Sequence, residues 1–281
     1  MTTNIDNRSA AGLAGPLTTS QRLQFLTDGY VRIDDAFPQR LAAEARTIFW
    51  DDLRLQGCLP DDPATWTRPV VRLGMYSHPL IVAAANTSTL HGAFDQLVGP
   101  GCWQPCTSVG TVPVRFPSAG DPGDTGWHID PGFDHQKPDF MDWRTNIHSR
   151  GRMLLMLILF SDVSEAEAPT RIRVGSHADI ARALIQAAEP GLTLRELLPY
   201  FRETSTRREI LATGAAGTVY LCHPFVVHSA QMHRGHEPRF MAQPPLLPRT
   251  EHWIDDLDRP ANEVARAIHL ALRARGQISE S

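Results

Sequence analysis

The spacing of hydrophobic residues along the chain changes at about residue 100. Residues 20–26 predict a short helix and residues 29–33 a strand, because apolar side chains recur first at helical spacing and then in a compact β-prone run. Residues 40–55 and 78–98 repeat apolar side chains every three or four positions, which is typical of helices that pack one face against a sheet. The part of the chain at about 17–100 is therefore predicted to be mainly helical.

Beyond residue 100 the pattern favours strands. Short β-prone runs are separated by Pro, Gly and Asp, which end strands and form turns. These runs lie at residues 108–116, 127–130, 153–163, 170–174, 217–222, 226–229 and 239–242. Many short strands predict a sandwich or barrel, here with a core at about 101–248. We also expect a helical insertion at about 179–214 and a C-terminal helix at about 250–278, most regular from Asn262 onward.

Composition limits the kinds of protein that the chain can be. A length of 281 residues with 42% hydrophobic content predicts one large domain at 17–281, after a frayed tail at 1–16. The net charge of −4 argues against a nucleic-acid partner, although all basic residues except Lys137 are Arg. The N-terminal segment has no apolar signal region, and no run of about 18 apolar residues occurs. We therefore expect a soluble, cytoplasmic protein without a membrane partner.

The four cysteines carry no predicted chemistry. They form no C-x₂-C pair and are too few for a disulfide scaffold. Cys102 and Cys106 could bind zinc, but reduced thiols are the more common state of such residues. Reduced thiols are therefore expected at Cys58, Cys102, Cys106 and Cys222.

A His-x-Asp sequence, His128-Ile129-Asp130, is the candidate for metal binding. In a strand, residues two apart point to the same side, so His128 and Asp130 could bind one ion while Ile129 packs on the opposite face. The Gly and Pro residues around this sequence exclude a helix interior and allow a short strand between loops. Chance alone gives about one His-x-Asp in a chain of this composition, so the context has to support the assignment.

A second copy, His177-x-Asp179, lies in a different context. Ser176 is predicted as a helix N-cap, and the residues after it repeat at helical spacing. In a helix, side chains two positions apart diverge by about 200°. The first copy is therefore favoured as the metal site.

His228, and Arg239 eleven residues beyond it, complete the candidate site. Two His and one carboxylate on one face of a metal leave three positions open, which non-haem Fe(II) oxygenases use for a co-substrate and O₂. An arginine can hold a carboxylate through two parallel hydrogen bonds. Taken alone, His228 could also be a hydrogen-bonded core histidine, and Arg239 a surface residue of an edge strand.

Three neighbouring histidines could compete with His228 as ligands. A ligand must lie on the strand face that the first pair uses, whereas His223 is predicted on a turn beside Pro224. We expect the neighbours to face solvent or to support the ligands from behind: His223, His233 and His236.

Four segments of the chain together form a specific pattern. They are Trp127-His128-Ile129-Asp130, Arg173-Val174-Gly175-Ser176-His177, Gly217-Thr218-Val219-Tyr220-Leu221-Cys222-His223-Pro224 running into His228, and Arg239. In this order and spacing they resemble the phytanoyl-CoA dioxygenase-like branch of the Fe(II)/2-oxoglutarate oxygenases. The resemblance covers about residues 29–244. Many relatives have Asn-Gly and Pro-Gly-Ser-His where this chain has Ala168-Pro169-Thr170 and Val174-Gly175-Ser176-His177, so details of these turns are expected to differ.

The resemblance implies a mainly β fold with flanking helices, a double-stranded β-helix (cupin-like jelly roll) with the metal inside the barrel mouth. It implies that His128, Asp130 and His228 bind Fe(II), that 2-oxoglutarate is the co-substrate and that O₂ is consumed. Arg239 would bind the distal carboxylate of 2-oxoglutarate. Arg115 occupies a strand position where the family often has a polar contact to the co-substrate. No catalytic residue beyond the metal ligands is expected.

Two hydroxyl residues are further candidates for co-substrate binding. Some relatives have a hydroxyl two positions after the distal histidine, where this chain has Ala230. Ser229 lies beside it but would point to the opposite face if the strand continues. Thr170 could supply the hydroxyl instead, or could be a solvent-facing strand residue.

Two loops, at 133–152 and 179–214, are placed to cover the barrel mouth, where such lids exclude water and select the substrate. Aromatic and cationic side chains in this region are candidates for substrate contacts. They are Trp127, Phe133, Trp143, Arg152 and Arg171, with Phe140, Arg144 and Arg150 as further members.

The predicted function is an Fe(II)- and 2-oxoglutarate-dependent dioxygenase that hydroxylates a small organic metabolite with release of succinate and CO₂. Desaturation, cyclisation and epimerisation share the same hydrogen-abstraction step and stay open. Because Asp130 is present, no ligand position is left for chloride, which argues against a radical halogenase. Two alternatives remain: a cupin-like metal-dependent isomerase or hydrolase that does not use O₂, and a non-catalytic ligand-binding relative.

Overall fold

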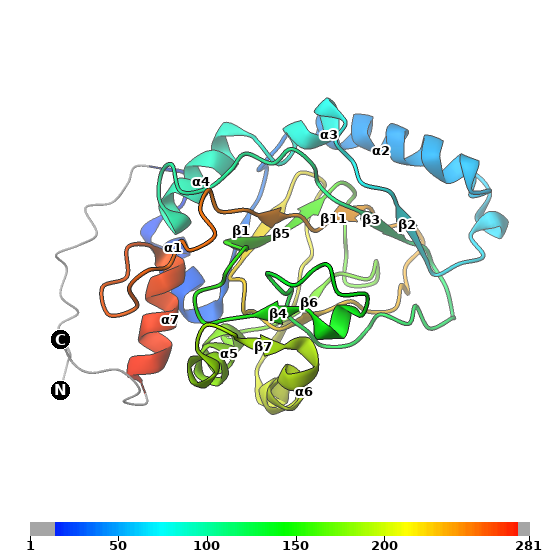
Figure 1. Cartoon of the computed structure of the whole chain (residues 1–281). Helices are drawn as coiled ribbons and strands as arrows, with labels where there is room; N and C mark the ends of the chain where they lie inside the picture. Colours follow the sequence, from blue (N-terminus) through cyan, green and yellow to red (C-terminus); the bar gives the residue numbers. More distant parts are fainter. Residues whose placement is uncertain (1–14, 275–281) are drawn as a thin grey trace.

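The computed structural model describes residues 15–274 and contains helices arranged around antiparallel sheets (Figure 1). The predicted tail at 1–16 lies almost entirely outside the described residues, as does the part of the predicted C-terminal helix beyond residue 274. No helix in the described part of the chain is both long enough and apolar enough to span a membrane.

The larger sheet is built around β5 (Leu154–Leu159), whose six residues are all buried. β9 (Val219–Cys222) pairs with one edge of β5 and, on its other side, with β1 (Tyr30–Ile33). β11 (Met241–Ala242) and β12 (Pro245–Leu246) pair with the other edge of β5. A strand that is buried on both faces has a continuous apolar run rather than an alternating pattern. This explains why the sequence of β5 shows no alternation.

The remaining strands form three smaller sheets. One has the order β10 (His228–Ser229), β6 (Arg171–Arg173), β8 (Glu209–Leu211). In the others, β2 (Val70–Leu73) pairs with β3 (Val112–Arg115), and β4 (Arg144–Thr145) pairs with β7 (Leu192–Thr193).

Two isolated bridges join these pieces into two layers. Arg115 on β3 pairs with Arg239, just before β11, so β3 continues the larger sheet. His128 pairs with His228 on β10, which adds one residue pair to the smaller sheet. The predicted strand at 127–130 is therefore reduced to a single bridge. Residues 115–128 carry the chain from the layer of the larger sheet to the layer of the smaller sheet. Residues 228–239 carry it back.

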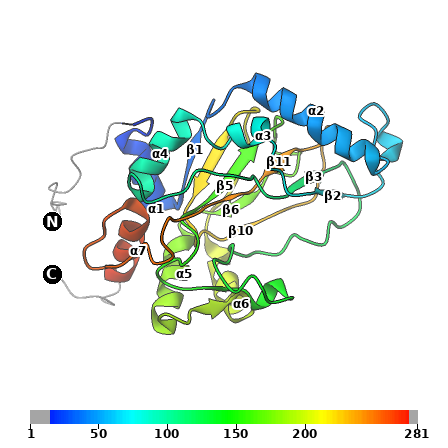
Figure 2. The same ribbon diagram turned by 45° about the horizontal axis from the view of Figure 1, so that its top comes forward.

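Helices cover the outer faces of the strands (Figures 1 and 2). α2 (Gln39–Leu55), α3 (Pro79–Ala83) and α4 (Ser88–Val98) lie on the side of the larger sheet, and α5 (Ser176–Leu184) and α6 (Leu194–Glu203) lie on the opposite side of the molecule. α1 (Thr19–Asp28) and α7 (Glu263–Arg273) pack against each other at one end. The helices thus leave the region between the two layers to the strands.

The side chains of β5 point alternately into two parts of the hydrophobic core. Met156 and Ile158 pack into the cluster that also contains Phe49 of α2. Leu157 and its neighbours on the other face pack against Ile172 of the smaller sheet. One face of β5 therefore packs against the outer helices, and the other face packs against the smaller sheet.

The predicted helix at 78–98 is two helices, α3 and α4, separated at residues 84–87. The side chain of Asn86 donates to the carbonyl oxygens of Val82 (2.9 Å) and Cys106 (2.9 Å), which anchors the break to a neighbouring loop. Thr87 then caps α4, its hydroxyl accepting a hydrogen bond from the amide of Leu90 (3.2 Å). Local side-chain bonds at Asn86 and Thr87 thus compete successfully with a continuous helix.

Three further boundaries differ from the prediction. Gly175, with a left-handed φ of 77°, precedes α5 in place of Ser176, whose hydroxyl instead accepts the amide of Val227 (2.8 Å). The predicted helical insertion at 179–214 begins at residue 176 and ends in a strand, β8, of the smaller sheet. α7 begins only at Glu263, where Asn262 caps it, so residues 250–262 are not helical. These boundaries depend on contacts with distant segments or on individual caps.

Candidate functional site

His128, Asp130 and His228 bring three metal-binding groups together. Within residues 15–274 they are the one group of three or more His, Cys, Asp or Glu whose donor atoms all lie within 4.8 Å of one another. Nε2 of His128 lies 3.9 Å from Oδ1 of Asp130, and Nε2 of His228 lies 3.8 Å from the same oxygen. The two histidines exchange backbone hydrogen bonds of 3.0 and 2.9 Å. Residues opposed in this way project to the same face of a sheet, so backbone pairing brings the imidazoles together.

Each imidazole is oriented by a backbone carbonyl. Nδ1 of His128 lies 2.8 Å from the oxygen of Gly126, and Nδ1 of His228 lies 3.1 Å from the oxygen of Val226. A carbonyl only accepts, so each Nδ1 donates and each Nε2 of the neutral ring keeps its lone pair. Burial lowers the pKa of His228 to about 4, which keeps this ring neutral near pH 7. Both free lone pairs are therefore available on the side of Asp130.

Arg152 keeps the carboxylate of Asp130 ionised. Its Oδ2 lies 3.3 Å from Nη1 of Arg152, while Oδ1 faces the histidines. Burial by itself would raise the pKa of this carboxyl, but Arg152 and, to a smaller extent, His228 and His128 hold the pKa below its usual value. Arg152, which is predicted as a substrate contact, is also a partner of Asp130.

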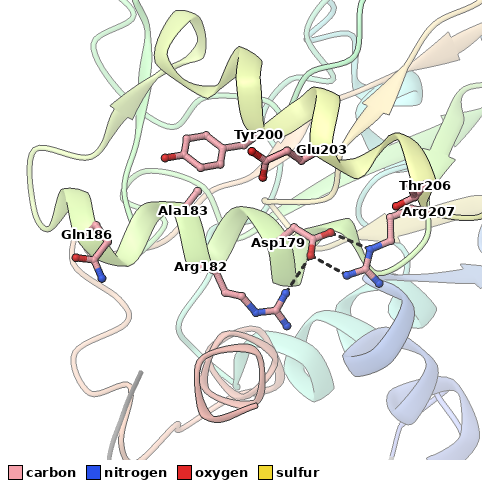
Figure 3. A pocket seen from close by; sticks show the side chains of 8 residues that line it. All are labelled: Asp179, Arg182, Ala183, Gln186, Tyr200, Glu203, Thr206 and Arg207. Carbon is pink, nitrogen blue, oxygen red and sulfur yellow. Dashed lines mark hydrogen bonds and ion pairs between the residues drawn. The ribbon is translucent and has the colours of Figure 1, made fainter. Parts of the chain in front are cut away.

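The second His-x-Asp copy directs its side chains to different places. His177 is buried and donates through Nε2 to the oxygen of Leu26 (3.1 Å). Asp179 lies in a groove of about 610 Å³ between α5 and α6, where it pairs with Arg182 (2.9 Å) and Arg207 (2.7 Å) (Figure 3). Two positions along a helix point in different directions, so this copy cannot hold one ion with both side chains.

The histidines near His228 take no part in the three-residue group. His223 is fully buried and donates through Nε2 to the oxygen of Val264 (3.3 Å), so the expectation that it faces solvent is wrong. His233 is also buried and donates to the oxygen of Glu237 (2.8 Å), whereas His236 is exposed. Their hydrogen bonds are with the backbone and serve the fold.

Arg115 and Arg239 form the second cross-strand pair. They exchange backbone hydrogen bonds of 3.1 and 2.9 Å, so their side chains lie on the same face. Arg115 is 3% exposed, and its Nη2 lies 2.7 Å from Oδ2 of Asp124. Arg239 is 1% exposed and donates to the carbonyl of Ala168 (2.6 Å); no carboxylate among residues 15–274 forms an ion pair with it.

Burial and the charge of Arg115 lower the pKa of Arg239. Nε of both arginines is buried without a hydrogen-bond partner. An anion bound beside these two guanidinium groups would offset the free-energy cost of burying their charges.

Thr170 and Ser229 do not face the cavity at the metal-binding group. Thr170 is buried, and its hydroxyl contacts the sulfur of Met241 (3.8 Å). The hydroxyl of Ser229 donates to the oxygen of Thr125 (2.6 Å). Ser229 thus points away from His228, as strand alternation requires. Neither residue occupies the place expected for a co-substrate contact, because both hydroxyls are engaged elsewhere.

Two arginines of β6 pack on Trp127. The guanidinium carbon of Arg171 lies 4.6 Å, and that of Arg173 3.7 Å, from the centre of the Trp127 ring. Nη2 of Arg171 also donates to the hydroxyl of Ser229 (2.9 Å). Arg171, which is predicted as a substrate contact, therefore contacts the residue next to each candidate metal-binding histidine.

A cavity of about 770 Å³ opens at the imidazoles of His128 and His228. Of the aromatic residues predicted as substrate contacts, Trp127 and Trp143 line it, whereas Phe133 lies under the guanidinium of Arg150 (5.0 Å) and is not part of the lining. The polar part of the lining contains Arg72, Arg115 and Asp124. The apolar part comes from Trp143, the 3₁₀ turn Phe140–Asp142 before it and α6: Phe140, Met141, Trp143, Leu194, Leu198 and Phe201.

Sequence reasoning placed residues 179–214, which contain α6, over the barrel mouth, but it named none of the α6 residues that line the cavity, and it missed Arg72. A signal existed for the helix, because Leu194, Leu198 and Phe201 recur at spacings of four and three on one helix face. That pattern also describes an ordinary buried face, and it does not say that a cavity lies beside it. For Arg72 no pattern distinguishes it from other strand arginines.

No protein-family model and no curated protein sequence matches the chain. Solved structures do match it. The non-haem α-ketoglutarate-dependent carbocyclase SnoK from nogalamycin biosynthesis has a TM-score of 0.58 at 17% identity over 85% of this chain and 87% of that chain. EctD from S. alaskensis with 2-oxoglutarate and 5-hydroxyectoine has a TM-score of 0.53 at 19% identity, covering 88% and 78% of the two chains.

HygX from Streptomyces hygroscopicus, with nickel, 2-oxoglutarate and hygromycin B bound, has a TM-score of 0.51 at 17% identity and covers 84% of this chain and 90% of that chain. EctD and HygX are also known with iron bound. EctD and HygX are known with iron or nickel, with 2-oxoglutarate, or with both. SnoK is described as dependent on α-ketoglutarate, which is another name for 2-oxoglutarate. The chain shares the fold of this class of non-haem metalloenzymes.

Proposed function

We propose that this protein is an Fe(II)- and 2-oxoglutarate-dependent dioxygenase that hydroxylates a small organic metabolite, with release of succinate and CO₂. The proposal depends mainly on the two isolated bridges, which lie at the two ends of the segments that cross between the layers, residues 115–128 and 228–239. His128 and His228 meet at one end, and Arg115 and Arg239 meet at the other. The first pair, with Asp130, offers the donors of a two-His, one-carboxylate site. The second offers guanidinium groups for a carboxylate.

The donor spacing suits one metal ion of the first transition row. Three donors about 2.1 Å from an octahedral ion and on one face of it lie about 3.0 Å from one another. The two imidazole-to-carboxylate separations, 3.9 and 3.8 Å, are less than about 1 Å longer, a difference that small side-chain rotations remove. The unpartnered Nε atoms of Arg115 and Arg239 likewise fit an acidic ligand. These residues therefore suit both groups that the proposal requires.

The strand order supports a finer description of the fold as a double-stranded β-helix. β3, β11, β5 and β9 follow one another in one layer through the Arg115–Arg239 bridge, and the His128 segment, β10, β6 and β8 do so in the other. Successive core segments alternate between the layers except at β6 and β8, which are neighbours in one layer, as in a jelly roll. The phytanoyl-CoA dioxygenase-like resemblance of the motifs agrees with this topology and forms part of the proposal.

The residues have separate roles in the proposed mechanism. When bound, iron with 2-oxoglutarate and O₂ supplies an oxidant that removes a hydrogen atom from the substrate and inserts oxygen. His128, Asp130 and His228 would hold the metal, and Arg152 keeps Asp130 charged and oriented. Arg239, with Arg115 beside it, would bind the distal carboxylate of the co-substrate. The cavity walls orient the substrate and limit access of water.

The proposal is tested by adding Fe(II) and 2-oxoglutarate to the protein without oxygen. We expect a weak visible charge-transfer band, which should be absent in His228→Ala and Asp130→Ala. His252→Ala is the matched control, because His252 is exposed and lies outside the group, so its band should be normal. A normal band in His228→Ala would refute the ligand assignment. Product formation without O₂ or 2-oxoglutarate would favour the metal-dependent isomerase or hydrolase instead.

A further inference from the structure

Several apolar side chains in the cavity are left partly uncovered. Phe140 is 41% exposed, and its ring centre lies 6.3 Å from that of His128. Met141, Trp143 and Leu198 line the same cavity and are only half-buried. We call Phe140, Met141, Trp143 and Leu198 the apolar wall. Apolar surface beside a polar metal-binding group is surface that an apolar ligand would remove from water.

The apolar wall is fixed in place by contacts outside the cavity. Arg195 on α6 reaches Asp139 (2.7 Å) and Asp142 (3.3 Å) on the segment that carries Phe140. The indole nitrogen of Trp143 donates to the oxygen of Lys137 (2.8 Å). β4, directly after Trp143, pairs with β7, directly before α6. A wall tied to a helix at several points offers a formed surface to a ligand.

The polar part of the cavity lining carries excess positive charge. Arg72 and Arg115 both pair with Oδ2 of Asp124, so two guanidinium groups share one carboxylate. Oδ1 of Asp124 and Nε of Arg115 are buried without a hydrogen-bond partner. The Arg72 side chain is 56% exposed and lines the cavity. With Arg115 assigned to the co-substrate, Arg72 remains as the cation that a substrate can reach, and it favours an anion.

We infer that the substrate is an organic anion with an apolar body, which packs its body against the apolar wall and directs its acidic group to Arg72. This inference rests on the proposed function for the reaction at the metal and for the assignment of Arg115 to the co-substrate, which leaves Arg72 to the substrate. A volume of about 770 Å³ suits a small molecule together with the co-substrate. A compact aromatic or alicyclic carboxylate has both required features.

The test uses 2-naphthoate and 2-naphthamide, which have nearly the same shape but differ in charge. Binding is measured by calorimetry, first to the protein alone and then with Fe(II) and 2-oxoglutarate in the absence of oxygen. We expect the acid to bind about tenfold more tightly than the amide, the size of a charge-assisted hydrogen bond. Arg72→Gln should remove this preference, whereas Arg68→Gln, an exposed arginine outside the cavity lining, should keep it.

A second pair of variants tests the apolar wall. Phe140→Ser should weaken both ligands about fivefold or more, because it removes apolar contact area. Leu55→Ser is the matched control, since Leu55 is 87% exposed and lies outside the cavity, and both affinities should stay unchanged. All four positions are exposed or half-exposed, so folding should be preserved; circular dichroism checks this.

Three results would overturn the inference: equal binding of acid and amide, an unchanged preference in Arg72→Gln, or unchanged affinities in Phe140→Ser. Failure of the proposed function gives a different result. In that case the charge-transfer band is missing while 2-naphthoate still binds with the expected dependence on Arg72 and Phe140, and the inference about the cavity is upheld.

Discussion

Asp130 shows how a single residue depends on a distant partner. One carboxylate oxygen faces the imidazoles, and the other is held by Arg152 at 3.3 Å. The charge of Arg152 opposes the effect of burial on the pKa of Asp130. A partner behind a metal ligand fixes the direction of the ligand and its charge. The residues next to the histidines are held similarly, through Arg171 on Trp127 and Ser229.

Arg152→Gln should therefore weaken metal binding about 10- to 100-fold. The loss follows because the hydrogen bond from Arg152 would no longer fix the direction in which the Asp130 carboxylate points. The measurement is a titration of the protein with Fe(II), or with Co(II) as a stable substitute, under anaerobic conditions. Arg150→Gln serves as the control, since Arg150 pairs with Glu251 away from the metal-binding group. An unchanged dissociation constant for Arg152→Gln would show that Asp130 is oriented without this contact.

Arg239→Leu should raise the 2-oxoglutarate concentration required for half-maximal turnover at least about tenfold. The reason is the loss of charge-assisted hydrogen bonds to a carboxylate in a buried site. Succinate formation as a function of 2-oxoglutarate concentration measures the effect. Arg239→Lys keeps the charge but not the planar fork, so its requirement should be intermediate. If Arg239→Leu behaves as the unmodified protein does, another residue holds the distal carboxylate.

At the scale of elements, α2 shows how a helix is attached to the larger sheet. Phe49 is fully buried, and its ring stacks on Phe240 at 5.9 Å and meets Phe160 edge-on at 5.3 Å. Both partners lie next to strands, after β5 and before β11 respectively. One side chain of α2 thus contacts two neighbouring strand ends and keeps them covered. Phe240 is also the residue that follows Arg239.

Phe49→Ala should lower the free energy of unfolding by about 3–5 kcal/mol, the usual cost of removing a large buried aromatic side chain. Leu55→Ala in the same helix should change it by less than about 0.5 kcal/mol, because Leu55 is almost fully exposed. Urea denaturation followed by circular dichroism gives both values. Similar losses for the two variants would mean that α2 is not anchored through Phe49.

At the scale of the whole molecule, two buried histidines connect several elements at one end. His177 on α5 donates to the oxygen of Leu26 on α1, and His223, after β9, donates to the oxygen of Val264 on α7. Their ring centres are 5.0 Å apart. Burial lowers the pKa of His177 to about 4 and that of His223 well below its usual value. Both rings are neutral in the folded protein near pH 7.

The protein should therefore lose stability as the pH falls from 6.5 towards 4. Above pH 6.5 His177 is neutral in both states and has no effect. Below it the unfolded chain takes up a proton that the folded protein binds only near pH 4, so unfolding is favoured, by about 3 kcal/mol in total for this residue. Unfolding by urea at pH 7 and pH 4.5 measures the change. His177→Gln should show a smaller dependence on pH; an equal dependence would contradict this origin.

Much of the fold could be predicted because helix periodicity and strand runs are local properties. The predicted helix at 40–55 corresponds closely to α2 (Gln39–Leu55), and the apolar run at 153–163 contains β5. The errors occurred where a distant contact decides a boundary. Ser176 bonds to Val227 instead of capping α5, and Asn86 anchors a break to Cys106. A sequence pattern contains no information on these distances.

The same division applies to the candidate site. Sequence alone selected His128 and Asp130, because residues two apart in a strand share a face, and the resemblance of the motifs implied His228 and Arg239. The tertiary structure assigned Arg152 to Asp130, Arg171 to Trp127, and the apolar wall to α6 and the 3₁₀ turn before Trp143. These assignments depend on how far apart two layers and their covering helix lie. That distance is set by packing between segments remote in sequence, which local periodicity does not encode.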